Sequence, residues 1–329
     1  MSPIGRFTSR ALASTAGALG LFAMACTAGG DKADSASGKA AGASDTAAKA
    51  SMVVATPLGA TEGMKTPESV RYDAELDRWY VSNINGNPSQ KDGNGFIAIV
   101  NPDSTGTMTM LAEGGRKGVV LNAPKGMALS GDTIWVADID MVRGINRRTG
   151  AVLANVDLRS MKATFLNDVA IGGDGAVYIT DTGITFDAKG GMTHPGVNRI
   201  FRLQGGKVTE VATGDSLANP NGIAWDAVNT RFVLAPFGGP AVQSWKTGDK
   251  VPVSLGTGPG QYDGIEVLKD GRILVSSWAD SAVHSLSSGT MTTIAKGLPA
   301  PADIGVDTKR NVLAVPLFND GKVRYFRIP

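Results

Sequence analysis

The sequence predicts an all-β protein, a six-bladed β-propeller that occupies residues 51–329. Two observations lead to this fold class. A unit of short strands and turns recurs along the chain, and no stretch shows sustained helical periodicity. The chain of 329 residues also contains 43 glycines and 16 prolines, a composition that favours many turns and little long helix.

Each unit begins with a polar residue, which precedes a short alternating strand, a turn and a second strand. These polar residues, which we call the anchors, recur every 40 to 57 residues, close to the length of a four-stranded propeller blade. Turns such as Lys269-Asp270-Gly271 suit the hairpin between the first two strands. The six anchors are Glu68, Lys125, Asn167, Asn221, Asp263 and Asp303.

The sixth unit is one strand short, because only residues 304–306, 312–316 and 322–328 have the pattern of strands in it. The segment Met52–Thr56 has strand character but no place in the first unit. We therefore expect this N-terminal strand to join the last blade as its outer strand. It would close the ring and leave no unpaired strand edge at the closure.

Residues 1–25 have the features of a signal peptide and are left out of the fold. Arg6 and Arg10 precede an apolar stretch that ends at Cys26, the only cysteine of the chain. This segment resembles a bacterial lipoprotein signal, which implies lipidation of Cys26. The alternative is an ordinary secretory signal with a chance cysteine. Residues 26–50 then form a flexible low-complexity linker, because their small and polar side chains cannot bury enough apolar area to fold.

A lipidated chain of this kind would lie at the bacterial cell envelope and face the periplasm. Thr27 follows the cysteine, and by resemblance to Gram-negative sorting this residue favours the outer over the inner membrane. The membrane would be contacted through the lipid anchor alone. A formal net charge of +2 without a basic block argues against a nucleic-acid partner. We expect a monomer that acts on a small molecule.

The first strand of each propeller blade lines the central channel, so the anchors should meet in a ring at one mouth of it. Three of them are carboxylates, two are amides and none is a histidine. Neighbouring carboxylates repel each other unless a cation or a proton lies among them. Oxygen ligands of this kind suit Ca²⁺ or Mg²⁺, and also a less selective Mn²⁺ or Zn²⁺ site. The alternative is that the anchors only solvate a water-filled channel.

Four motifs in order, each at the start of a blade, resemble the senescence-marker-protein family of gluconolactonases and regucalcin. They are Glu68, Asn167-Asp168, Asn221-Gly222 and Asp263-Gly264. The resemblance covers the chain from about residue 51 to its end. It implies a divalent metal, preferably calcium, held by Glu68, Asn221 and Asp263, and a contact of Asn167 with the substrate or with a water on the metal. It also implies lactone hydrolysis, with Asp263 as the base that activates water.

Two residues depart from the family pattern. Sugar lactonases carry an arginine two residues before the blade-three asparagine, and Phe165 stands there in this chain, which favours a more apolar substrate. Lys125 adds an ammonium group to the ring. It would pair with Glu68 or another acid, or it would replace part of the charge of the metal. Besides Asn167, we take Lys125, Phe165 and Asp181 as candidate substrate contacts.

Two long loops, Ser82–Gly95 and Thr182–Val197, follow second strands and should surround the pocket. Of the two histidines, His194 lies in the second of these loops and His284 in a later strand. Two functions remain open at this stage. One is a metal-dependent lactone or ester hydrolase. The other is a non-catalytic, envelope-anchored propeller that binds a small ligand or a protein partner.

Overall fold

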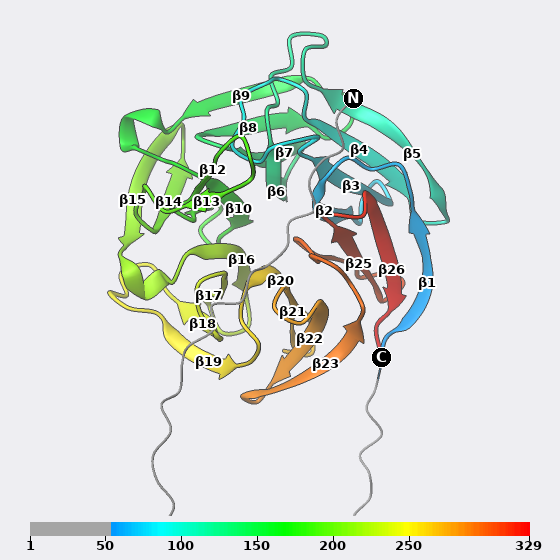
Figure 1. The fold of residues 1–329 in the computed structure, drawn as a ribbon, viewed down its shortest axis with the longest axis vertical. Coiled ribbons are helices and arrows are strands. Elements are labelled where there is room, and N and C mark those ends of the chain that lie inside the picture. Colours follow the sequence, from blue (N-terminus) through cyan, green and yellow to red (C-terminus); the bar gives the residue numbers. More distant parts are fainter. Residues whose placement is uncertain (1–53) are drawn as a thin grey trace, which may run out of the picture. The chain divides into compact units, whose positions relative to one another are not determined.

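The computed structural model describes residues 54–329, and these form six four-stranded antiparallel sheets arranged as blades around a common axis (Figure 1). The predicted six-bladed β-propeller is confirmed. The predictions for the signal peptide, for Cys26 and for the linker lie outside the described residues. Among the described residues, no helix has the length and apolar character needed to cross a membrane.

Blades one to three follow one another along the chain and run from the inner to the outer strand. Blade one consists of β2 (Pro67–Asp73), β3 (Arg78–Asn83), β4 (Phe96–Asn101) and β5 (Ser104–Glu113). Blade two consists of β6 (Pro124–Ser130), β7 (Thr133–Asp138), β8 (Met141–Asn146) and β9 (Val152–Asp157). Blade three consists of β10 (Leu166–Ile171), β11 (Val177–Asp181), β14 (Arg199–Gln204) and β15 (Lys207–Thr213).

The later blades repeat this order. Blade four consists of β16 (Pro220–Asp226), β17 (Arg231–Pro236), β18 (Ala241–Trp245) and β19 (Val253–Thr257). Blade five consists of β20 (Tyr262–Val267), β21 (Ile273–Ser277), β22 (Ala282–Ser287) and β23 (Thr290–Lys296). Blade six consists of β24 (Gly305–Asp307), β25 (Val312–Leu317), β26 (Lys322–Arg327) and β1 (Thr56–Thr61). The remaining elements are a small hairpin, β12 (Thr185–Phe186) with β13 (Met192–Thr193), and two 3-10 turns, η1 (Arg159–Met161) and η2 (Asp215–Leu217).

The ring closes through its N-terminal strand, as the sequence predicts. β1 pairs antiparallel with β26 and completes blade six as its outer strand. The predicted position of this strand, Met52–Thr56, is wrong, because β1 spans Thr56–Thr61. The pairing register shifts between Pro57 and Gly59, so the strand accommodates two residues that are typical of turns.

Apolar side chains fill the interfaces between neighbouring blades of the described chain. Between blades three and four, for example, the ring centroids of Tyr178 and Phe232 lie 4.3 Å apart. Close-packed interfaces of this kind have low compressibility. The inner strands, which carry the anchors, are therefore held in fixed positions relative to each other.

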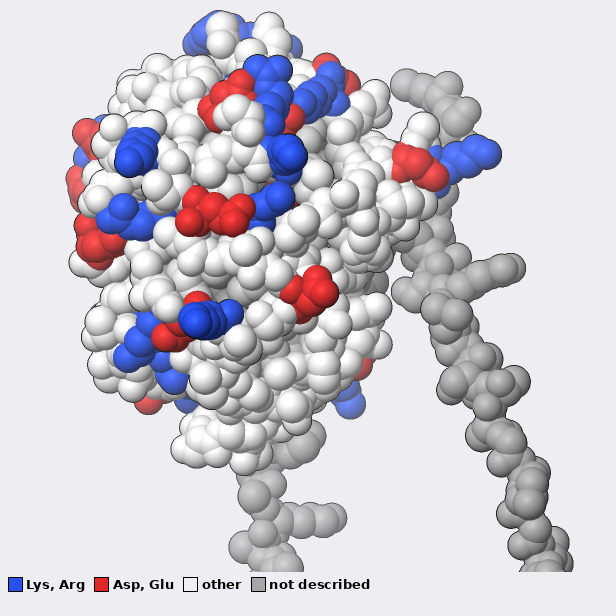
Figure 2. All heavy atoms as spheres, turned by 90° about the vertical axis from the view of Figure 1, so that its left-hand side faces the viewer, with Lys and Arg blue, Asp and Glu red and all other residues white. Residues whose placement is uncertain are grey.

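The outer side of the propeller that Figure 2 shows carries lysine and arginine side chains next to aspartate and glutamate side chains. Opposite charges alternate on it, and no broad area is occupied by one sign alone. Electrostatic recognition of a nucleic acid needs a stripe or patch of basic residues. This side offers no such surface.

Candidate functional site

Five of the anchors lie where the pairing between the first and second strands of a blade is irregular. The register shifts directly around Glu68, Lys125, Asn167, Asn221 and Asp263. A β-bulge interrupts the strict alternation of side chains and re-aims one of them. The sixth anchor, Asp303, precedes β24, and its N–H donates to the carbonyl of Glu68 over 2.8 Å.

Side-chain hydroxyls replace the ladder hydrogen bonds that the bulges remove. In blade three the Thr180 hydroxyl accepts a hydrogen bond from the N–H of Asp168 at 2.9 Å and donates to the carbonyl of Asn221 at 2.7 Å. Ser276 accepts the N–H of Gly264 at 2.8 Å in blade five. A buried N–H without a partner is costly, so these hydroxyls stabilise the irregular backbone. Thr180 also ties the bulge of one blade to the anchor of the next.

Glycine follows the anchor in blades four and five because the next anchor segment packs against it. A Cβ on Gly222 would lie 2.3 Å from the carbonyl oxygen of Asp263. A Cβ on Gly264 would lie 2.4 Å from the Cα of Asp303. Both distances are far below van der Waals contact. The Asn-Gly and Asp-Gly dipeptides therefore bring neighbouring anchors close together.

We expect Gly264→Ala to destabilise the protein by about 1–3 kcal/mol, since the added methyl group has no space beside the backbone of blade six. Urea unfolding followed by circular dichroism measures this loss. Gly106→Ala is the matched control, because nothing lies within 4 Å of a Cβ at that position. Equal midpoints for both variants would contradict the proposed packing role of Gly264.

Three buried carboxylates lie at this mouth of the channel, close enough for their charges to interact. Glu68 and Asp263 are each 4% exposed, and Asp303 is 2% exposed. Burial, together with the charges of Asp263 and Asp303, raises the pKa of Glu68 well above its usual range. Burial and the charge of Asp303 likewise raise the pKa of Asp263 well above its usual range. The ionised form of these acids is therefore energetically unfavourable without a compensating positive charge.

Oxygen atoms of all three acids lack a partner among the described residues. They are Oε2 of Glu68, Oδ1 of Asp263 and Oδ1 of Asp303, and each is buried. A buried polar atom without a hydrogen bond is rare and calls for an explanation. A bound cation or an ordered water would supply the missing interaction.

The two amide anchors complete the ring. Asn221 is 6% exposed, and its side chain beside Asp263 lowers the pKa of that acid, as does the indole of Trp278. The amide nitrogen of Asn167 donates to the hydroxyl of Thr182 at 2.9 Å. This bond fixes which way the Asn167 amide is turned and leaves its oxygen for a ligand. Both side chains thus add neutral oxygens to the carboxylates.

Lys125 is almost fully buried and does not pair with Glu68 by a direct contact. Its Nζ donates to the carbonyl of Ala123 at 3.1 Å and lies 4.2 Å from the centroid of the Phe165 ring. Burial lowers the pKa of Lys125 to about 8, while the charges of Glu68 and of two aspartates act in the opposite direction. The ammonium group lies beside the ring, and its positive charge acts to lower the pKa of Glu68 without a direct contact.

Two predicted substrate contacts have other partners in the structure. Asp181 is fully buried, and its carboxylate accepts hydrogen bonds from the backbone N–H groups of Thr164, Phe165 and Gly183. Its oxygens are occupied by the backbone, and the contact of Asp181 with the substrate stays a prediction. Phe165 is 4% exposed and packs below Lys125. Its ring also lies 5.8 Å from that of Phe186, measured between the ring centroids.

The donor set fits a hard divalent cation. Glu68 and Asp263 each offer a carboxylate oxygen without a partner, and Asn221 offers an amide oxygen. Such oxygens are the ligands that calcium and magnesium prefer. Among residues 54–329 there is no group of three or more His, Cys, Asp or Glu side chains able to hold an ion. Asn221 is therefore needed as the third donor.

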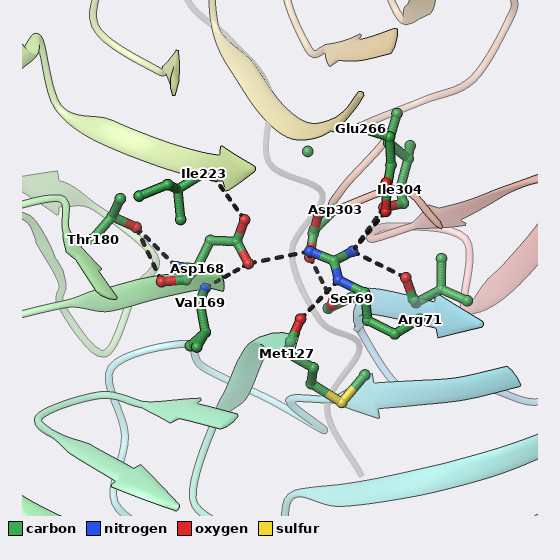
Figure 3. Close-up of polar contacts among 12 residues, drawn as sticks. Ser69, Arg71, Met127, Asp168, Val169, Thr180, Ile223, Glu266, Asp303 and Ile304 are labelled. Carbon is green, nitrogen blue, oxygen red and sulfur yellow. Dashed lines mark hydrogen bonds and ion pairs between the residues drawn. The ribbon is translucent and has the colours of Figure 1, made fainter. Parts of the chain in front are cut away.

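Arg71 is a largely buried cation, with a side chain 13% exposed, that the sequence did not single out (Figure 3). Its Nη2 lies 2.8 Å from Oδ2 of Asp303 and 3.3 Å from Oδ1 of Asp168. The other N–H groups of the guanidinium donate over 2.7 to 3.0 Å to the backbone carbonyls of Val70, Met127 and Ile304. Arg71 lies three residues after the anchor Glu68, on a strand that lines the channel. A charged residue inside such a strand needs a partner, and this was the feature of the sequence that could have revealed it.

Beyond Arg71 the channel opens into a second cavity of about 300 Å³. It is lined by the later residues of the inner strands, whereas the anchors lie at the beginning of those strands. Glu266 is the acid of this cavity, and burial raises its pKa to about 7 although the charge of Arg71 acts against this shift. Arg71 therefore separates the anchor ring from the cavity at the opposite end.

The two long loops meet each other. The Asn87 side chain in the loop of blade one donates to the carbonyl of Asp187 in the loop of blade three at 2.7 Å. The hydroxyl of Ser89 accepts the N–H of Phe186 at 2.9 Å. Since both loops follow second strands, they join on the anchor side of the propeller. Loops on a rigid scaffold commonly determine specificity.

Neither histidine belongs to the anchor ring. Nδ1 of His194 lies 3.3 Å from the side-chain nitrogen of Asn219, in an exposed contact. His284 lies in β22, where its ring contacts Asp280 at 3.1 Å and Thr293 at 3.2 Å. The chemistry of the ring thus rests on carboxylates, amides and Lys125.

A family model described as SMP-30/Gluconolactonase/LRE-like region matches residues 66–301. Among solved structures, regucalcin from Agrobacterium tumefaciens, described as a calcium-binding protein, is 16% identical with a TM-score of 0.64, covering 84% of this chain and 95% of that one. A luciferin-regenerating enzyme is 15% identical with a TM-score of 0.61, covering 82% and 94%. No curated protein sequence matched the chain.

A different enzyme has a similar fold. Virginiamycin B lyase from Staphylococcus aureus is 14% identical with a TM-score of 0.55, covering 82% of this chain and 99% of the lyase. A variant of that lyase in which a histidine is replaced by alanine is described as catalytically inactive. At these identities the likeness shows the fold alone. The chemistry has to be argued from the residues of the anchor ring.

Proposed function

Because the chain belongs to the SMP-30/gluconolactonase/LRE-like family, we propose that it is a metal-dependent lactone hydrolase whose active site is the anchor ring. The observation that carries this proposal is the pair of buried, unpartnered carboxylate oxygens on Glu68 and Asp263, next to Asn221. These atoms are where a cation and a reacting water would be held. Calcium is the preferred ion, and Mg²⁺, Mn²⁺ and Zn²⁺ are the alternatives.

When bound, the cation would polarise the ester carbonyl and stabilise the negative charge that develops on its oxygen. Glu68 and Asn221 supply oxygens that fix the ion at the mouth of the channel. Asp263 accepts a proton from the attacking water, whose oxygen bonds to the carbonyl carbon. The ring C–O bond then breaks, and the proton passes from Asp263 to the departing alkoxide. The product is an open-chain hydroxy acid.

Asp263 suits the role of base because its surroundings act on its pKa in opposite directions. Burial and Asp303 raise the pKa, whereas Trp278 and Asn221 lower it. A cation beside the carboxylate would lower the pKa further and keep the group ionised at neutral pH. Asn167 would orient the substrate or the water, and the hydrogen bond of its amide to Thr182 supports this role.

The second candidate function is a non-catalytic binding propeller. Lys125 favours it, because a buried ammonium group already supplies one positive charge close to Glu68. In that case the ring would hold a ligand without a metal ion. However, Lys125 contacts Ala123 and Phe165, so its ammonium group lies beside the ring. The carboxylate oxygens of the ring therefore remain without partners.

We further propose that the protein is a monomer, lipid-anchored to the bacterial envelope through Cys26 and facing the periplasm, with the outer membrane as its site. The basic residues and apolar stretch before Cys26 support this location. Labelling with a radioactive fatty acid in cells tests it, and Cys26→Ala should abolish the label. A soluble, unlabelled wild-type protein would contradict the anchor.

Removal of divalent cations tests the hydrolase directly. We expect EDTA treatment followed by desalting to reduce lactone hydrolysis to below about 1% of its initial rate, since loss of the oxyanion's partner costs several kcal/mol. Calcium should restore the rate and raise the melting temperature, because the ion binds only the folded state. Full activity after complete chelation would rule out the metal-dependent mechanism.

Two asparagine variants sharpen this test. Asn221→Ala should weaken the apparent calcium affinity at least about tenfold, because it removes one neutral oxygen from the proposed site. Asn229→Ala, in the same blade, loses only a hydrogen bond to Asp226 at 2.7 Å and should bind calcium like the wild type. Isothermal titration calorimetry compares the two without requiring turnover.

A further inference from the structure

One residue in each blade follows the second strand directly and lies beside the anchor of that blade. In five blades its backbone N–H donates to a carbonyl two or three residues before the anchor, over 2.9 to 3.1 Å. This repeated bond, formed for instance from Trp278 to Gln261, fixes these residues at the mouth of the channel. We call the set the collar: Ile84, Ile139, Thr182, Phe237, Trp278 and Phe318.

The collar is apolar except for Thr182. Its three aromatic members are half-buried and contact one another across blades four, five and six. The ring centroids of Phe237 and Trp278 lie 5.8 Å apart, and those of Trp278 and Phe318 lie 5.4 Å apart. Phe318 also packs against the cluster that contains Ile84 and Ile139. The apolar surface therefore continues from blade four around to blade two.

Trp278 connects this apolar surface to the acid that we assign as the base. Its backbone N–H donates at 3.0 Å to the carbonyl of Gln261, two residues before Asp263, and its indole acts to lower the pKa of that acid. The indole nitrogen is buried and has no other partner among the described residues. A ligand that reaches Asp263 must therefore lie against the collar.

The collar offers little to a substrate rich in hydroxyl groups. Thr182 is its only polar member, and its hydroxyl donates to the carbonyl of Pro220 at 2.8 Å while it accepts the amide of Asn167 at 2.9 Å. A hydroxyl group of a ligand that is buried there without a partner loses its hydrogen bonds to water at a cost. An aromatic ring or an alkyl chain gains from the same contact.

We propose that the collar selects lactones that carry an aromatic or alkyl substituent and disfavours polyhydroxylated sugar lactones. This inference rests on the proposed hydrolase function and assigns its substrate class. The carbonyl group of the lactone faces the anchor ring, and the apolar substituent lies against Phe237, Trp278 and Phe318. Phe237 and Phe318 determine specificity without touching the reacting atoms.

The test compares two six-membered lactones, dihydrocoumarin, which carries a fused benzene ring, and glucono-1,5-lactone, which carries hydroxyl groups. We expect kcat/KM to be at least about a hundredfold higher for dihydrocoumarin after correction for spontaneous hydrolysis. Phe237→Ser should lower that ratio about tenfold, mainly through KM, whereas Phe237→Tyr should preserve it. The control Trp225→Ser alters an aromatic residue that lines the opposite cavity and should leave the ratio unchanged.

The outcomes separate the two proposals. Faster turnover of the sugar lactone, or a ratio that does not respond to Phe237→Ser, overturns the collar assignment and leaves the hydrolase standing. Hydrolysis of neither lactone overturns the hydrolase. Binding of 3,4-dihydro-2-quinolinone, the lactam analogue of dihydrocoumarin, then decides on the collar. Binding that is weakened tenfold by Phe237→Ser supports it, and absence of binding overturns it.

Discussion

Arg71→Met is expected to lower the free energy of unfolding by about 3–5 kcal/mol, the typical cost of removing one partner from a buried ion pair. Asp303 and Asp168 would lose their cation, and three backbone carbonyls would lose a donor. Methionine fills a similar volume, so the loss reports mainly on charge and hydrogen bonding. Urea unfolding at pH 7 measures it.

The matched control is Arg202→Met, which removes a partner from Asp174 at the surface. Exposed ion pairs of this kind contribute about 0–1 kcal/mol. A second variant, Arg71→Met combined with Asp303→Asn, removes one of the unpaired charges and should recover part of the lost stability. A loss below about 1 kcal/mol for Arg71→Met alone would show that the channel does not depend on this cation.

Asp263→Asn is expected to lower kcat/KM for lactone hydrolysis at least about a thousandfold, since general base catalysis and a proposed metal ligand are lost together. The same variant should be more stable than the wild type when divalent cations are absent. Asparagine keeps the size of the side chain and removes a charge from a group of mutually repelling acids. Steady-state kinetics and thermal unfolding in EDTA provide the two measurements.

The stability gain of this variant should depend on pH. The pKa of Asp263 is raised in the folded protein, so the metal-free wild type holds its proton more tightly when folded than when unfolded. Its stability therefore falls as the pH rises from the ordinary aspartate pKa of about 4 through the raised pKa, and Asp263→Asn should show a shallower decline over that range. Asp270→Asn, in an exposed turn, serves as the control. Activity within tenfold of the wild type would exclude Asp263 as the base.

The repeat in the sequence was sufficient to predict the fold and the positions of the anchors. Polar residues such as Asn221 stand out at the beginning of an apolar strand, and their spacing fixes one per blade. The closing strand was predicted with the right partner but placed too early, because Pro57 and Gly59 look like a turn. A register shift within β1 absorbs them, and such a shift depends on the neighbouring strand.

Side-chain directions at the anchors were harder to predict. Lys125 was expected either to pair with an acid or to replace part of the charge of the metal, and the structure places its ammonium group over Phe165. A β-bulge redirects side chains by an amount that the local sequence does not determine. Arg71 was missed for a similar reason, since its partners Asp168 and Asp303 come from blades far away in the chain.

The collar cannot be recognised from any single motif of the sequence. Phe237 and Phe318 are unremarkable in the sequence, because isolated aromatic residues after a strand are common. Only the equivalence of their positions in successive blades reveals a shared surface, and their ring contacts through Trp278 join it. Phe165 gave a first indication of an apolar substrate, and the proposed preference now rests on the collar.

The closure of the ring also determines how the propeller would respond to a pulling force. Tension applied to the chain before residue 54 first loads the hydrogen bond from the N–H of Ala55 to the carbonyl of Ile294, and then β1, whose pairing with β26 begins at Thr56 and Arg327. The pull would open the ladder from that end, one pair after another, and hydrogen bonds loaded in sequence resist less than bonds loaded together. The outer edge of blade six would therefore yield first, while the inner strands that carry the anchors remain assembled.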